Sequence, residues 1–211
     1  MNNYRLSGYD RALMEIRSSI VELAQGVSAL LEKGLRVLAT PESARTIDWR
    51  KEDDQIDQMR DRIVQRILEI MTLQQLRTQD LRWLLGYHRM AQELERVADY
   101  ACDIAELAGL SSEIKQPEEI LQMAEQTQLM CEKTIESLQL EQDRVEELDR
   151  LDDFLDSTYI ALQKRFVSES QIEKTGYLGF SLILARTMER IGDHILNVAE
   201  ALVYIKVGKQ N

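Results

Sequence analysis

Apolar residues near the start of the chain recur at alternating steps of three and four positions. They occupy Leu13, Ile16, Ile20, Leu23, Val27, Leu30, Gly34 and Val37. Because side chains three or four positions apart share one face of a helix, this spacing predicts a long amphipathic helix that ends near Ala39. The segment Thr40-Pro41-Glu42 then offers an N-cap residue, a proline at the first helical position and an early acid, so a second helix is expected to follow it.

The same spacing predicts five further helices along the chain. They are expected over residues 49–70, 80–109, 120–138, 141–167 and 170–207. Thr78 reads as the cap of the third helix, and Gly109 as the glycine that follows its last turn. The segment Ser170-Gln171-Ile172-Glu173 has the form of a capping box and should open the sixth helix.

The periodicity lapses between Leu110 and Gln116, and Pro117 follows. This break is the best candidate for a linker, with three helices before it and three after it. The chain is therefore expected to be all-α, with two tandem antiparallel three-helix bundles over residues 1–110 and 117–211.

An internal repeat supports this division. Residues 95–106 align without a gap to residues 189–200, an offset of 94 positions. The first segment opens with Glu95-Arg96-Val97-Ala98-Asp99 and the second with Glu189-Arg190-Ile191-Gly192-Asp193. Such self-similarity indicates that the two bundles are related by internal duplication.

Each repeated segment carries oxygen-bearing side chains at steps of four residues. They are Glu95, Asp99 and Asp103 in the first segment and Glu189, Asp193 and Asn197 in the second. This spacing aligns them along one helix stripe, which is expected to face outward from the apolar seam. Carboxylate and amide oxygens suit Mg²⁺, Ca²⁺ or Mn²⁺, and carboxylates also bind iron. The alternatives are a solvated acidic face, or pairing of the acids with Arg96 and Arg190.

Composition and charge narrow the function classes. With 44% hydrophobic residues but only two prolines and nine glycines, the chain favours a helical fold with a substantial core. A net charge of −11 argues against nucleic acid as a partner and against simple attraction to an anionic membrane. The start of the chain lacks a secretion signal, and no apolar run is long enough to span a bilayer, so a cytoplasmic location is expected.

Catalytic and cofactor motifs find little support. Leu85 and Ile191 stand three residues before the two histidines, so the Glu-x-x-His motif of di-iron bundle enzymes is absent. No glycine-rich phosphate loop occurs, which leaves nucleotide binding without support.

The segments that begin at Glu95 and Glu189 resemble the paired signature of the PhoU family of phosphate transport system regulatory proteins. Asp54-Gln55-Ile56-Asp57 and Asp80-Leu81-Arg82 also resemble the first repeat of that family. The resemblance implies a metal-binding role for two acid pairs, Glu95 with Asp99 and Glu189 with Asp193. It implies the same role for Asp54 and Asp57. The counterpart on the fifth helix stays open between two pairs, Asp149 with Asp152 and Asp153 with Asp156.

The resemblance implies a regulator and not an enzyme. Its expected partners are the ATPase subunit of the phosphate-specific ABC transporter and a phosphate-sensing histidine kinase. It would act as a negative regulator of phosphate uptake and starvation signalling, bound only peripherally to membrane complexes. Exposed helical seams suggest a homodimer. Two rival hypotheses are a carboxylate-bridged metal enzyme and an inert helical scaffold, and the identity of any divalent metal or iron stays open.

Overall fold

The structure is a computed structural model of the 211-residue chain that describes residues 8–73, 75–110, 116–169 and 172–207. All regular elements in these ranges are helical, which confirms the predicted all-α class. The elements are α1 (Gly8–Arg36), η1 (Pro41–Thr46), α2 (Trp49–Leu73), α3 (Thr78–Leu110), α4 (Glu118–Leu140), α5 (Val145–Ser168) and α6 (Ile172–Val207). No helix in the described ranges is both long and apolar enough to cross a membrane.

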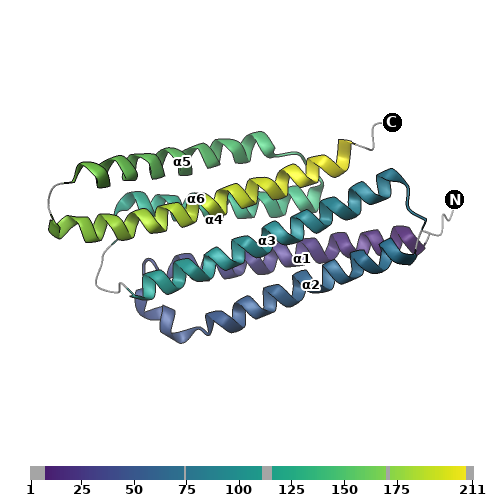
Figure 1. Ribbon diagram of the computed structural model, residues 1–211, viewed down its shortest axis with the longest axis horizontal. Helices are drawn as coiled ribbons and strands as arrows, with labels where there is room; N and C mark the ends of the chain where they lie inside the picture. The colour runs from purple at the N-terminus through teal and green to yellow at the C-terminus, as the bar shows by residue number, and fades with distance from the viewer. Residues whose placement is uncertain (1–7, 74, 111–115, 170–171, 208–211) are drawn as a thin grey trace.

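The helices form two three-helix bundles that lie side by side. In the first, α1, α2 and α3 contact one another, and in the second α4, α5 and α6 do so. The bundles meet through α3 against α6 and α1 against α4, and the contact between α3 and α6 is the most extensive in the molecule. The four inner helices thus form a ring, α1–α3–α6–α4, while α2 and α5 cover it from outside (Figure 1).

The core is continuous through both bundles. The α1 seam is buried, with Ile16, Ile20 and Leu23 all at or below 1% exposure, and Ile120 and Met123 of α4 join the same apolar cluster. Each bundle therefore covers part of its apolar stripe with the other bundle. The predicted linker falls between α3 and α4, and most of it lies outside the described residues.

The second long helix, α2, begins nine residues after Thr40, the N-cap residue expected from the sequence. Thr40-Pro41 opens the short 3₁₀ helix η1, and α2 starts only at Trp49, which corrects the expectation for Thr40. Asp48 caps α2 instead, because its Oδ1 accepts a hydrogen bond from the backbone N–H of Lys51 at 3.2 Å. The indole of Trp49 donates to the carbonyl of Ala44 at 2.9 Å and so ties η1 to the start of α2.

Gly109 does not end its helix, contrary to expectation. The third helix continues through Leu110, and none of the described glycines has a left-handed backbone. A Cβ on Gly109 would lie 2.8 Å from the Cβ of Ala44, so the glycine permits close approach of η1 to α3. The capping box expected at 170–173 falls partly outside the described residues.

Candidate functional site

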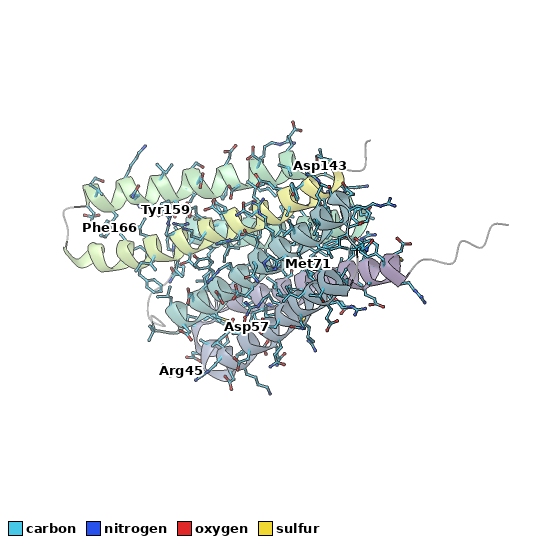
Figure 2. The ribbon with its side chains drawn as sticks, turned by 45° about the vertical axis from the view of Figure 1, so that its right-hand side comes forward. Arg45, Asp57, Met71, Asp143, Tyr159 and Phe166 are labelled. Atoms are coloured by element: carbon cyan, nitrogen blue, oxygen red, sulfur yellow. The ribbon has the colours of Figure 1, made fainter. Side chains whose placement is uncertain are left out.

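The first acidic cluster lies where α2 packs against α3. We define it as Asp53 and Asp57 of α2 with Glu95 and Asp99 of α3 (Figure 2, Asp57 labelled). Arg60 contacts it from α2, with 2.7 Å between its Nη2 and Asp57 Oδ1 and 3.8 Å between its Nη1 and Glu95 Oε1. The side chain of Glu95 is only 12% exposed, so the contact between the two helices encloses it.

Crowding of carboxylates in this cluster disfavours their ionised forms. Burial raises the pKa of Glu95, and the neighbouring charge of Asp99 raises it further, against the opposing effect of the arginines. Burial also raises the pKa of Asp99, although Arg96 Nη1 lies 2.9 Å from its Oδ2. The arginines therefore leave part of the negative charge uncompensated.

The second acidic cluster occupies the matching place between α5 and α6. It comprises Asp152 and Asp156 of α5 with Glu189 and Asp193 of α6. Asp152 and Glu189 are 9% and 8% exposed, which is unusually low for acidic residues. Burial raises the pKa of Asp152 to about 7, and the charges of Asp156, Asp193 and Glu189 add to the effect. Arg186 pairs with Glu189 and is the nearest compensating charge.

The structure locates the acids on the outer helices that the sequence left undecided. Asp152 and Asp156 on α5 lie near the acids of α6. The α5 counterpart of the α2 acids is therefore neither of the two expected pairs, Asp149 with Asp152 or Asp153 with Asp156, but one residue from each. Asp156 is exposed, as Asp149 and Asp153 are, but the nearby charge of Asp193 raises its pKa and so associates it with α6. On α2 the matching pair is Asp53 and Asp57, whereas Asp54 is exposed. Sequence reasoning missed Asp53, although its spacing of four residues from Asp57 matches that of the acids on α3.

The third position of each stripe behaves differently in the two repeats. Eight residues along a helix add roughly 80° of rotation to two full turns, so this position drifts away from the first two. Asp103 is exposed, and its charge still raises the pKa of Asp53. Asn197 lies instead at the contact of α3 with α6, where it donates to Glu93 Oε2 at 3.2 Å and accepts from Arg89 at 3.0 Å.

The expectation that both stripes face outward is wrong for the two glutamates. The side chains of Glu95 and Glu189 are 12% and 11% exposed, because α2 and α5 lie over them. A fully solvated acidic face is therefore also excluded for these residues. The expected pairing of the acids with Arg96 and Arg190 is present only in the first repeat at close distance. Arg96 contacts Asp99 closely, but Arg190 Nε lies 3.9 Å from Glu189 Oε2.

Both clusters contain buried oxygens that lack hydrogen-bond partners. They are Glu95 Oε2 in the first cluster and Asp152 Oδ1 and Glu189 Oε2 in the second. Arg96 Nε lies 3.6 Å from Glu95 Oε2 and Arg190 Nε 3.9 Å from Glu189 Oε2, so Asp152 Oδ1 is the least compensated of the three. An unpartnered buried carboxylate oxygen is costly, and a cation is a ligand that would satisfy it. In the described ranges, however, no three acidic, histidine or cysteine side chains converge into an ion-sized cage. The donor chemistry fits a hard cation, and binding one requires the carboxylates to turn toward a shared point.

Gly192 explains how Asp152 comes so close to α6. A Cβ on Gly192 would lie 2.4 Å from Asp152 Oδ1 and 2.8 Å from Leu155 Cδ1. The carboxylate therefore uses the space that a larger residue would fill. Ala98 holds the equivalent place in the first repeat.

A polar network joins the two repeats between the clusters. His194 Nδ1 lies 2.6 Å from Glu93 Oε2, and the ring of His194 stacks on that of Tyr100 with 5.6 Å between centroids. The hydrogen bond to Glu93 lowers the pKa of that carboxyl against the opposing effect of burial. His194 thus serves the contact of α3 with α6. Tyr100 and His194 are separated by the same 94 positions as the repeats, so they are equivalent residues.

Comparison with known proteins gives one consistent result. The model of the PhoU domain matches residues 20–108 and 120–202, one match for each bundle. A phosphate-specific transport system accessory protein PhoU homolog of Synechocystis is 30% identical over all of this chain and 96% of its own length. A homolog of the same description from Clostridium acetobutylicum is 29% identical over 76% of each chain.

Solved structures agree with the fold. The crystal structure of PhoU from Pseudomonas aeruginosa has a TM-score of 0.85 at 23% identity and covers 95% of this chain and 99% of its own. That of the phosphate transport system regulatory protein PhoU from Streptococcus pneumoniae has a TM-score of 0.80 at 25% identity, covering 95% and 97%.

Proposed function

The chain belongs to the PhoU family, and from that premise we propose that it is an accessory protein of phosphate transport that restrains phosphate uptake and phosphate-starvation signalling. The observation that carries the proposal is the pair of PhoU domain matches, one on each bundle. In the proposed role the protein works in the cytoplasm, as a homodimer, and links the transporter ATPase subunit to a phosphate-sensing histidine kinase. The six long helices of the described residues offer broad faces to such partners.

A deletion strain tests the regulatory role. Loss of the protein should raise expression of a phosphate-starvation reporter in phosphate-rich medium, and an intact copy of the gene should restore the low level. A reporter that stays low in the deletion strain would contradict negative regulation. Pull-down of the ATPase subunit and of the kinase from the same strain tests the two partners separately.

We also propose that the acidic clusters bind divalent cations or iron. The second cluster is the stronger candidate, because Asp152 and Glu189 are buried and each has an oxygen without a hydrogen-bond partner. Asp156 and Asp193 complete its donor set, and Glu95, Asp99, Asp53 and Asp57 form the donor set of the first cluster. A bound cation would neutralise the carboxylates and cross-link the outer helix of each bundle to an inner one.

Chelation tests the metal proposal independently of regulation. Chelators should lower the melting temperature of the native protein, and Mn²⁺, Mg²⁺ or iron should restore it, because a ligand that binds only the native state stabilises it. Glu189→Gln with Asp193→Asn should abolish most of this response. Asp149→Asn with Asp153→Asn, a matched loss of charge at exposed positions of α5, should keep it. If the native protein contains no metal and shows no shift, the metal proposal is wrong, and the regulatory proposal is unaffected.

No catalytic role is part of the proposal. Relatives carry the description of accessory proteins, and burial raises the pKa of the thiols of Cys102 and Cys131 to about 12, which leaves them protonated and poor nucleophiles. Hydrolase and oxidase assays on metal-loaded protein should show no turnover. Turnover lost in the Glu189→Gln, Asp193→Asn variant would favour the rival metal-enzyme hypothesis.

A further inference from the structure

The two contacts between the bundles differ in character. The contact of α3 with α6 is extensive and is closed by the Glu93–His194 network. The contact of α1 with α4, on the opposite side of the ring, is less extensive and opens into a groove of about 670 Å³. This groove is distant from the acidic clusters, which lie where α2 and α5 meet α3 and α6.

The floor of the groove is apolar. Leu35 of α1 and Ala124 of α4 form its base at 9% exposure each. Leu121, which is 36% exposed, and the half-buried Leu129 form its sides. Gln128 also lines the groove, and its Nε2 donates to Ser28 Oγ of α1 at 3.1 Å. The result is a trough between two helices, the geometry that accepts the apolar stripe of a third helix.

The rim of the groove is acidic. Glu32, Glu125 and Glu132 line it, and Arg36 is its only basic residue. Arg36 already pairs with Glu32 one turn away. Glu132 Oε1 accepts a hydrogen bond from Gln128 Nε2 at 3.3 Å, but no basic side chain of the groove lining other than Arg36 is present to pair with Glu125 or Glu132. The rim therefore has uncompensated negative charge on the α4 side, next to exposed apolar surface.

We propose that the α1/α4 groove is a docking site for an amphipathic helix of another protein with lysine or arginine beside its apolar stripe. Leucine-sized side chains of that helix would cover Leu121 and Leu129, and its cations would pair with Glu125 and Glu132. An acidic rim opposes anionic lipid and nucleic acid. A second copy of this chain, with a net charge of −11, is a poorer match than a basic helix. The site does not depend on phosphate regulation or on metal.

A labelled peptide with leucine in heptad spacing and lysine at the other positions serves as the probe, and its leucine–glutamate equivalent serves as the control. Fluorescence anisotropy on the full chain should show binding of the lysine peptide only. Ala124→Trp, which fills the trough, should weaken binding by at least about tenfold, and so should Glu125→Gln with Glu132→Gln. Asp149→Asn with Asp153→Asn removes the same charge from α5 and should leave the affinity unchanged.

Each other outcome overturns the proposal. Equal loss of affinity in the groove and α5 variants would mean general attraction to an acidic protein. No binding by the native chain would exclude a basic helix as the occupant. A dimer in sedimentation that Ala124→Trp dissociates would assign the groove to a second copy. The Glu125, Glu132 variant changes only exposed side chains, so it keeps the test decisive should Ala124→Trp fail to fold.

Discussion

At the scale of single residues, the two acidic clusters share a pattern but differ in enclosure. The side chains of Glu95 and Glu189 are enclosed alike, at 12% and 11% exposure, but Asp152 of the second cluster is buried, whereas Asp53 of the first is half-buried. The exchange of Ala98 for Gly192 accounts for part of this difference, since Asp152 occupies the space of the missing Cβ. The second cluster should consequently respond more strongly to pH and to ions than the first.

Asp152→Asn should stabilise the protein in a pH-dependent way. The pKa of Asp152 is raised from 3.8 to about 7, so the native state favours the protonated carboxyl. This contribution to stability is fully present below the unfolded pKa and is lost as pH rises through about 7. Asparagine resembles the protonated acid, and the gain should therefore grow from near zero at the acid end to about 2 kcal/mol above neutrality, after allowance for solvent screening.

Urea unfolding in chelator at several pH values measures this gain. Asp149→Asn is the control, because Asp149 is exposed and its charge is the weakest of the four that raise the pKa of Asp152. A gain that is constant across pH would show that the raised pKa of Asp152 does not govern the stability of the cluster.

The acids of α3 and α6 could be identified from the sequence because repetition marks them. Those of the outer helices could not all be identified. Asp149, Asp152, Asp153 and Asp156 offer several pairings on α5, and the choice depends on how α5 is rotated against α6. That rotation follows from packing, including the close contact at Gly192, and no local pattern encodes it.

At the scale of elements, apolar periodicity located all six long helices, since each buries a stripe of its own. Local end signals were less reliable. Thr40-Pro41 and Asp48 both have the form of helix starts, and only the fold decides that the first opens η1 and the second caps α2. Gly109 resembles a helix stop, yet its role is to admit Ala44 of η1.

The packing of α5 on α6 can be tested with two glycines of the same helix. Gly192→Ala should destabilise the protein by about 1–3 kcal/mol, because the new methyl group collides with Asp152 and Leu155. Gly176→Ala meets open space and should stabilise it by about 0.5–1 kcal/mol through better helix propensity. Denaturant midpoints measure both changes. Equal effects of the two substitutions would show that α5 does not press on α6 at Gly192.

At the scale of the whole molecule, the continuous core predicts that the two bundles unfold together. Neither bundle covers its inner apolar face alone, so loss of one exposes the core of the other. In a Trp83→Phe variant, Trp49 is the only tryptophan and reports on the first bundle. Its fluorescence and the helical circular dichroism of the whole chain should show coincident transitions. A fluorescence transition that precedes part of the loss of helix would mean that the bundles unfold independently.

The stacked rings of Tyr100 and His194 say something about the ancestry of this molecule. They hold equivalent places in the two repeats, 94 positions apart, and they stack on each other where α3 packs against α6. In an ancestor made of two identical short chains, the residue equivalent to Tyr100 and His194 would have contacted the same residue of the second chain. One codon would then have determined both residues of the pair. Once both copies lay in one gene, each could mutate alone. Two identical chains could not place a tyrosine against a histidine at equivalent positions, as Tyr100 and His194 are placed here, with His194 also bound to Glu93.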